Sequence, residues 1–146
     1  MERVAALGLD VGRRRIGVAG CDGLGLFATG ITTIHRTNWT KDMEQLAQLV
    51  KERGVKTLVV GMPYNMDGSL GFQGRQVQKF AERCAKYLNL PLEYVDERLT
   101  SYAAEQLMMA EGLSLREHRE VIDRKAAAII LQQWLDQLRI RGQEIG

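Results

Sequence analysis

The stretch GLDVGRRRIGVA, Gly8–Ala19, decides the fold, because it has the pattern of two strands joined by a tight turn. One acidic residue, Asp10, lies inside an apolar run, and Gly12 and three consecutive arginines follow it. Two chemistries use such a stretch. A glycine turn can bind the phosphates of a nucleotide, and an aspartate can hold a metal ion that cleaves a phosphodiester.

The elements on either side of this hairpin alternate between strand and helix patterns. Val4–Val11 is apolar on both faces, as in the middle of a sheet, and the later segments change to the helical period. The order predicts an α/β fold with a mixed five-stranded sheet, a three-strand antiparallel meander plus two further strands, and helices on both faces. The expected strands are Val4–Val11, Ile16–Cys21, Leu26–Ile34, KTLVVGMP at 56–63 and LEYVDE at 92–97; the expected helices are 43–50 ending at Gly54, 77–88, 101–112 and 121–140; Tyr64–Gly74 is an expected loop.

Composition and length describe an ordinary globular chain. The 146 residues are 45% hydrophobic and 26% charged, which suits one globular domain over residues 1–146. No apolar run approaches the ~20 residues that span a bilayer. No secretory signal pattern is visible, so we expect a cytoplasmic protein without a membrane partner. Cys21 and Cys84 lack the spacing of a zinc site, and we expect them to be small buried side chains.

Positive charge is weak overall but locally clustered. The net charge is +2, which is too small to identify a nucleic-acid partner. Arg13, Arg14 and Arg15 are consecutive, and a second basic segment contains Arg116, Arg119, Arg124 and Lys125. Either cluster, taken alone, is explained better by a solvated surface than by phosphate binding.

Three carboxylates occupy positions where a purely structural role is costly. Asp10 lies near the end of a central strand, and Glu97 follows the fifth strand as the chain leaves the sheet. Asp123 lies four residues before Ala127, on the apolar stripe of the last helix. Burying one unpaired carboxylate costs several kcal/mol. Each acid also has an ordinary structural explanation. Asp10 could accept hydrogen bonds from the Gly12 turn, Glu97 could pair with Arg98 or face solvent, and Asp123 could interact favourably with the helix dipole.

Together the three acids point to one metal site. Ligands of open α/β sheets gather at the carboxyl ends of strands, where Asp10 and Glu97 are expected. A helix entering that edge with Asp123 in its first turn would complete a cluster of oxygen ligands, which suits Mg²⁺ or Mn²⁺ rather than zinc or copper. A pair of such ions can activate water and stabilise the leaving oxygen in phosphodiester cleavage without a histidine base. Neighbouring arginines would then hold the substrate's phosphates.

Four motifs, taken together, resemble one known family. They are GLDVGRRRIGVA at 8–19, VVGMPYNMDGS at 59–69, VDERLTS at 95–101 and VIDRKAAAIILQQWL at 121–135. From Val4 to Leu138 the chain resembles the YqgF-type proteins, which are described as nucleases maturing pre-16S rRNA and as Holliday-junction resolvases. The resemblance implies a ribonuclease-H-like fold, and it implies that Asp10, Glu97 and Asp123 are the catalytic, metal-binding acids.

The same resemblance suggests residues that contact substrate. Asn65 lies in what looks like the family's substrate-side loop, and the motif VDERLTS contributes three further candidates. Residues 70–74 read LGFQG, where relatives often have an acidic residue and proline. The full set of expected substrate-binding residues is Arg13, Arg14, Arg15, Asn65, Arg98, Thr100, Ser101, Arg124 and Lys125.

Three alternatives stand beside maturation of pre-16S rRNA. ATPases of the actin and sugar-kinase kind also begin with an Asp-x-Gly turn, but they need two linked domains, for which 146 residues leave no room. A non-catalytic nucleic-acid-binding module would not need all three acids. A Holliday-junction resolvase acting on branched DNA would normally be a symmetric dimer, and the sequence leaves monomer and homodimer open. The expected partners are pre-rRNA, with branched DNA as the alternative, and ribosomal assembly particles.

Overall fold

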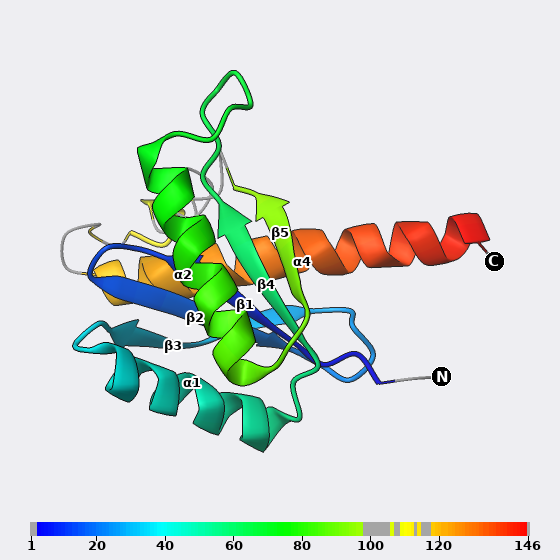
Figure 1. The fold of residues 1–146 in the computed structure, drawn as a ribbon. Helices are drawn as coiled ribbons and strands as arrows, with labels where there is room; N and C mark the ends of the chain where they lie inside the picture. Colours follow the sequence, from blue (N-terminus) through cyan, green and yellow to red (C-terminus); the bar gives the residue numbers. More distant parts are fainter. Residues whose placement is uncertain (1–2, 98–105, 107–108, 113, 115–117, 146) are drawn as a thin grey trace.

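The computed structural model describes residues 3–97, 106, 109–112, 114 and 118–145, the side chains of 143–145 excepted. Its centre is a five-stranded sheet with the strand order β3-β2-β1-β4-β5 (Figure 1). The first three strands form an antiparallel meander, while β4 runs parallel to β1 and β5 parallel to β4, so the predicted mixed sheet is confirmed. The strands are β1 (Ala6–Val11), β2 (Arg15–Cys21), β3 (Ala28–His35), β4 (Thr57–Met62) and β5 (Leu92–Asp96).

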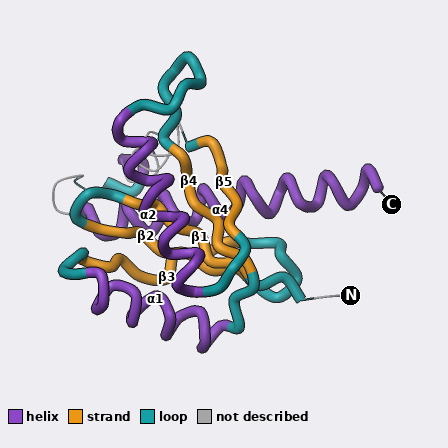
Figure 2. The backbone as a smooth tube through the Cα atoms, viewed as in Figure 1, coloured by secondary structure: helices purple, strands orange, loops and turns teal. Residues whose placement is uncertain are grey.

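Helices cover both faces of this sheet, as predicted (Figure 2). The helices are α1 (Trp39–Arg53), α2 (Phe72–Leu88) and α4 (Arg119–Ile145). α1 and α2 lie on one face and α4 lies on the other. Each face of the sheet packs against its own hydrophobic core, and successive strand residues point to opposite faces. In β1, Leu7 and Leu9 pack under α1 and α2, whereas Ala6 packs under α4.

The helices α1, α2 and α4 all begin earlier than the sequence indicates, and α1 begins at Trp39 rather than at residue 43. α2 begins at Phe72, inside the expected loop. The sequence misses this start because residues 72–76 carry no apolar periodicity, and Phe72 itself is 72% exposed. α4 begins at Arg119, and its last part extends beyond the sheet (Figure 1). The predicted end of α1 is confirmed, since Gly54 adopts a left-handed φ of 60°. Most of the helix expected over 101–112 lies outside the described residues.

The two cysteines are both free thiols. Cys84 is buried under α2, as expected, while Cys21 is half-buried at the end of β2. Among the helices that the structure describes, none has the length and apolar character needed to cross a membrane.

Candidate functional site

Asp10 and Glu97 meet at the carboxyl edge of the sheet. β1, β4 and β5 are parallel, so their carboxyl ends lie at one edge. Asp10 is the next-to-last residue of β1, and it points to the α4 face because its neighbours Leu9 and Val11 point to the other face. Glu97 directly follows β5, and its N–H donates to the Met62 carbonyl of β4 at 3.2 Å. The backbone pairing therefore continues through Glu97 and fixes where its side chain starts.

Two glycines leave room for the acids and for α4. A Cβ on Gly61 of β4 would lie 2.7 Å from Glu97 Oε2, so only glycine lets the glutamate side chain cross β4. A Cβ on Gly17 of β2 would lie 2.0 Å from the Asp123 carbonyl oxygen. α4 therefore crosses β2 in direct backbone contact, and this contact places Asp123 over the sheet.

Burial raises the pKa of both strand-end acids. For Glu97, loss of water is the largest cause, followed by the charge of Asp10, a hydrogen bond with Asp10 and the charge of Asp96; its pKa rises to about 8. For Asp10, burial is again the largest cause and outweighs the hydrogen bond with Glu97, while the charge of Asp123 adds to the rise; its pKa is about 6. These pKa values describe a proton held on Glu97 and donated to Asp10.

One oxygen of this pair has no partner. Glu97 Oε2 is buried, and no group in the described part of the chain forms a hydrogen bond with it. A buried acceptor without a donor costs about 1–3 kcal/mol, and more for a charged group. The Asp10–Glu97 pair therefore combines excess negative charge with an unused ligand atom, which is the chemistry that a hard cation requires.

Asp123 lies beside these acids but is held by an arginine. Its charge acts on Asp10, and Arg15 Nε donates to its Oδ2 at 2.6 Å in a half-buried ion pair. The first turn of α4 is also tied to β3, because Thr33 Oγ1 donates to the Glu120 carbonyl at 2.7 Å. Within the described residues, no three acidic, histidine or cysteine side chains form a set that could hold a metal ion. Asp123 is therefore near enough for its charge to act on Asp10, but its Oδ2 is paired with Arg15.

Arginines gather next to this ion pair. Arg13, Arg14, Arg15 and Arg119 line a surface cavity of about 520 Å³. Arg15 contacts Asp123, whereas Arg13 and Arg14 are exposed at the β1–β2 turn. The sequence does not indicate that Arg119 belongs to this cavity, although Arg119 lies in the second basic segment. Only the fold brings the first turn of α4 against the β1–β2 turn.

Asn65 has a local partner in the loop before α2. Its Nδ2 donates to Ser69 Oγ at 3.0 Å, and its backbone N–H donates to the Ser69 carbonyl at 2.8 Å. The Ser69 hydroxyl in turn donates to Asp67 Oδ1 at 2.6 Å. These contacts show that the Asn65 side chain shapes the exposed loop.

The basic residues of α4 point to two different surroundings. Lys125 Nζ pairs with Glu111 Oε1 at 3.1 Å. Arg124 packs over β3, since a Cβ on Gly30 would lie 2.8 Å from the Arg124 Cβ. Three further expected residues, Arg98, Thr100 and Ser101, lie outside the described residues.

Comparison with known proteins identifies the family. The family model of RuvX, described as Holliday junction resolvase, matches residues 4–137. The chain belongs to the RuvX family. The expected resemblance to YqgF-type proteins is thereby confirmed.

Relatives of this RuvX chain extend over nearly its whole length. A Trichormus variabilis protein and a Nostoc protein are each 63% identical over 140 residues, which is 96% of this chain and 93% of theirs. A Gloeothece citriformis protein is 62% identical over 138 residues, 94% of this chain and 91% of its own. All three carry the name of a candidate pre-16S rRNA nuclease.

Solved structures of resolvases share the fold of this RuvX chain. Thermus thermophilus RuvC, in complex with a Holliday junction substrate, matches with a TM-score of 0.54 at 12% identity, covering 90% of this chain and 93% of its own. Fowlpox virus resolvase, in complex with Holliday junction DNA, matches with a TM-score of 0.57 at 11% identity, covering 92% and 99%. At such low identity the likeness concerns the fold alone. Because RuvC-like resolvases have a ribonuclease-H-like fold, that expectation is confirmed.

Proposed function

We propose that this protein is a metal-dependent nuclease that hydrolyses phosphodiester bonds in the 5′-end maturation of pre-16S rRNA. The observation that carries the proposal is the half-buried pair of Asp10 and Glu97, which share a proton, while the buried Glu97 Oε2 has no hydrogen-bond partner among the described residues. Removing two neighbouring carboxylates from water costs free energy of folding, and a bound cation would offset that cost. The name carried by the 63%-identical relatives supplies the substrate class.

The acids fit a divalent cation of the hard, oxygen-preferring kind. Asp10 and Glu97 offer carboxylate oxygens at one sheet edge, which suits Mg²⁺ or Mn²⁺. Asp123 is the third proposed ligand, and it becomes available when its carboxylate exchanges Arg15 for the cation. When bound, ions of this kind, two in the proposed mechanism, activate water and neutralise charge on the leaving oxygen.

The neighbouring arginines hold the substrate in this mechanism. Arg13, Arg14 and Arg119 line the cavity beside the Asp123–Arg15 pair. Guanidinium groups suit phosphates because two parallel N–H groups can donate to two oxygens. Once Arg15 leaves Asp123, its N–H groups can donate to the same phosphate. The second rank of proposed substrate contacts comprises Asn65, Arg98, Thr100, Ser101, Arg124 and Lys125.

Cleavage of a 5′-extended 16S rRNA precursor by the purified protein tests the proposal. In Asp10→Asn or Glu97→Gln, we expect the rate in Mg²⁺ or Mn²⁺ to fall roughly a thousand-fold, because metal ions supply several kcal/mol of transition-state stabilisation and each ~1.4 kcal/mol is tenfold. Glu44→Gln is the matched control, since Glu44 is exposed on α1. It should cleave like the wild type.

Three results would overturn the nuclease proposal. One is wild-type cleavage by Asp10→Asn, which would leave the acids without a catalytic role. The second is a protein that turns over ATP and leaves RNA intact, as an ATPase of the actin and sugar-kinase kind would. The third, a protein that binds RNA but never cuts it, would point to a non-catalytic binding module.

Holliday-junction resolution is the second candidate, and the description of the RuvX family favours it. A resolvase presents two symmetric sites to branched DNA, so it requires a homodimer, whereas cleavage of a single RNA strand needs one site. Cells depleted of the protein separate the two functions. Unprocessed 5′ ends of 16S rRNA, in cytoplasmic ribosomal assembly particles, support maturation; normal rRNA with recombination defects supports resolution.

A further inference from the structure

A second basic cavity lies on the opposite face of β1 from the catalytic acids. It has a volume of about 260 Å³ and includes Val11 and Gly12, which directly follow Asp10. Val11 packs in the core under α1 and α2, whereas Asp10 points toward α4. The other wall is α2, which contributes Lys79 and Arg83. The cavity therefore begins at the edge that carries the acids and continues along α2.

Two arginines in this cavity are held by aromatic rings. Arg36 follows β3; its Cζ lies 4.4 Å from the Phe80 ring centroid, and its Nη1 donates to the Gly12 carbonyl at 2.7 Å. The Cζ of Arg83 lies 3.8 Å from the centroid of the Trp39 ring. A stacked guanidinium uses its flat face on the ring and keeps N–H groups free at its edge. Both side chains are therefore pre-organised to bind an anion.

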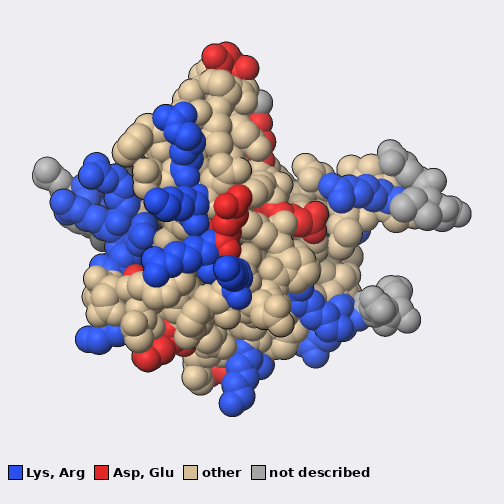
Figure 3. Space-filling view, in the orientation of Figure 1, with Lys and Arg blue, Asp and Glu red and all other residues tan. Residues whose placement is uncertain are grey.

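The cations of this cavity outnumber the acidic side chains near them and form no ion pair within the described residues. Its lining includes Arg13, Arg36, Lys79 and Arg83, and in the described part of the chain none of the four pairs with a carboxylate. Two carboxylates lie near these cations: Asp42 of α1, whose charge acts on Cys84 as those of Arg36 and Arg83 do, and Glu82 of α2, whose charge acts on Tyr94. Figure 3 shows the basic side chains gathered over α2 and the surface beside it. Cations this close repel one another, so their placement favours an anionic ligand over a structural role.

Arg13 connects this cavity to the arginines at the catalytic edge. It lines both the cavity along α2 and the one that it forms with Arg14, Arg15 and Arg119. Arg15 in turn contacts Asp123. Basic side chains thus form a continuous path from the acids, over the β1–β2 turn, to α2.

We propose that the cavity along α2 binds the phosphates of the RNA strand that continues away from the cleaved bond. The inference rests on the proposed nuclease function, because the strand would pass from the acids over Arg13 into this cavity. Phe80 and Trp39 each place a ring face against an arginine, so those faces do not serve as stacking platforms for bases. Binding there is therefore to phosphate, independent of base sequence and strongly dependent on salt.

RNA binding in EDTA, where metal-dependent cleavage is blocked, tests this proposal. Fluorescence anisotropy would compare labelled RNAs of about five and about twenty nucleotides, because only the longer one spans a site beyond the cleaved bond. Each phosphate contact contributes about 0.7 to the slope of log affinity against log salt for a single strand. For the long RNA, Lys79→Gln/Arg83→Gln should lower this slope by about 1.4 and weaken binding about tenfold or more at moderate salt.

Two further variants keep the result interpretable. Lys41→Gln/Lys51→Gln removes the same charge from exposed positions of α1 and should change affinity by less than about twofold. Lys79→Gln alone leaves the Arg83–Trp39 stack intact and should lower the slope by about 0.7. The expected loss is larger for the long RNA than for the short one, and it is equal for purine-rich and pyrimidine-rich strands.

The proposal is overturned if the Lys79/Arg83 variant binds the long RNA with the affinity and salt slope of the α1 control. A loss that depends on base sequence would overturn it as well. Failure of the nuclease proposal is read separately, from wild-type cleavage in Mg²⁺ or Mn²⁺. A wild type that cleaves, with variants that bind alike, rejects only the cavity. A wild type that never cleaves rejects the nuclease function and the assignment of the strand to a cleaved bond, while the binding data still decide whether the cavity holds RNA phosphates.

Discussion

The two edges of the sheet use aspartate in opposite ways. In the loop after β2, Asp22 accepts hydrogen bonds from the N–H groups of Leu24, Leu26 and Phe27 at 2.7–3.1 Å, and the bond from Phe27 is the largest cause of its lowered pKa. At the other edge, burial raises the pKa of Asp10. The first carboxylate is stabilised as an anion by the protein, whereas the second is left in need of a proton or a cation.

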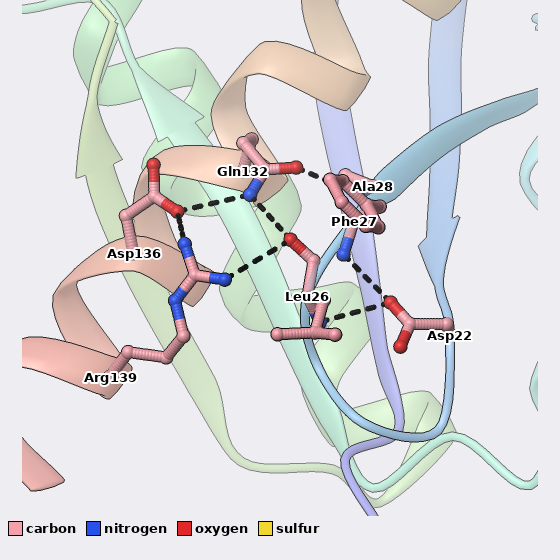
Figure 4. Close-up of polar contacts among 7 residues, drawn as sticks. All are labelled: Asp22, Leu26, Phe27, Ala28, Gln132, Asp136 and Arg139. Atoms are coloured by element: carbon pink, nitrogen blue, oxygen red, sulfur yellow. Dashed lines mark hydrogen bonds and ion pairs between the residues drawn. The ribbon is translucent and has the colours of Figure 1, made fainter.

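Helix α4 spans both edges and shows the same contrast. Near Asp22, Gln132 accepts from the Ala28 N–H at 2.8 Å and donates to the Leu26 carbonyl at 2.9 Å, and Arg139 pairs with Asp136 (Figure 4). We call these loop–helix contacts the clasp. At the first turns of α4, Asp123 has Arg15 as a partner beside two acids whose charge is not balanced. The polar groups of the clasp are paired with one another, whereas the carboxylates of Asp10 and Glu97 are left in need of a proton or a cation.

The largest expected effect is on the pH dependence of stability. The pKa of Asp10 rises from 3.8 to about 6 and that of Glu97 from 4.5 to about 8 on folding. A raised pKa means that the folded state binds protons more tightly, so the contribution is full below about pH 4 and is lost as pH rises through about 8. Without metal, the free energy of unfolding should fall by about 2–4 kcal/mol across this window, measured by urea denaturation in EDTA.

A divalent ion and a double variant sharpen this prediction. Mn²⁺ should restore stability at pH 8 and have little effect at pH 5, because protonated carboxyl groups are poor ligands. Asp10→Asn/Glu97→Gln should make stability nearly independent of pH in the same window. The lowered pKa of Asp22 acts in the opposite direction, since its contribution is lost as pH falls. A wild type whose stability is flat or rises from pH 4 to 8 in EDTA would remove the contrast between the two edges.

The next effect concerns the exchange of Arg15 for a metal ion. Arg15→Gln should raise the affinity for Mn²⁺ about fivefold to tenfold, because an ion pair worth about 1 kcal/mol no longer has to break before Asp123 can bind metal. Isothermal titration of the protein without RNA measures this affinity directly. Arg14→Gln is the matched control, since it removes the same charge from the same cavity and leaves the pair intact.

The two arginine variants separate direct competition from the general effect of charge. We expect Arg14→Gln to change the affinity by less than about twofold, because exposed charges are screened. An equal gain in both variants would mean that only the net charge of the edge matters. No gain in Arg15→Gln would mean that Asp123 does not bind the metal, and the ligand set would then be limited to Asp10 and Glu97.

Features that depend on local patterns could be predicted from the sequence. The alternation of apolar residues predicts the strands, and helical spacing from Ala127 places Asp123 on the inward stripe of α4, which crosses β2 at Gly17. The position of Asp10 at a strand end follows in the same way. Each of these inferences needs only the period of one element and its neighbours.

Features that depend on contacts between separate elements could not be predicted from the sequence. The Arg15–Asp123 pair joins residues 108 positions apart, and nothing in either motif indicates that the arginine faces the acid rather than substrate. The cavity along α2 brings Arg36 to Phe80 from separate elements. Residues 72–76 have no apolar periodicity, so the sequence pattern assigns Phe72 to the loop although it begins α2. In each case the deciding contact is between elements, where periodicity carries no information.

The smallest expected effect lies in the clasp, where a substitution should change stability alone. Gln132→Ala removes the bonds to Ala28 and Leu26, and we expect it to lower the free energy of unfolding by about 1–2 kcal/mol, measured by urea denaturation. Gln133→Ala is the matched control; within the described residues the Gln133 side chain makes no hydrogen bond, and its loss should cost less than about 0.5 kcal/mol. Cleavage of the rRNA precursor should be unchanged in both. If Gln132→Ala slows cleavage at temperatures where it stays folded, α4 transmits strain between its ends, and the two edges are not independent.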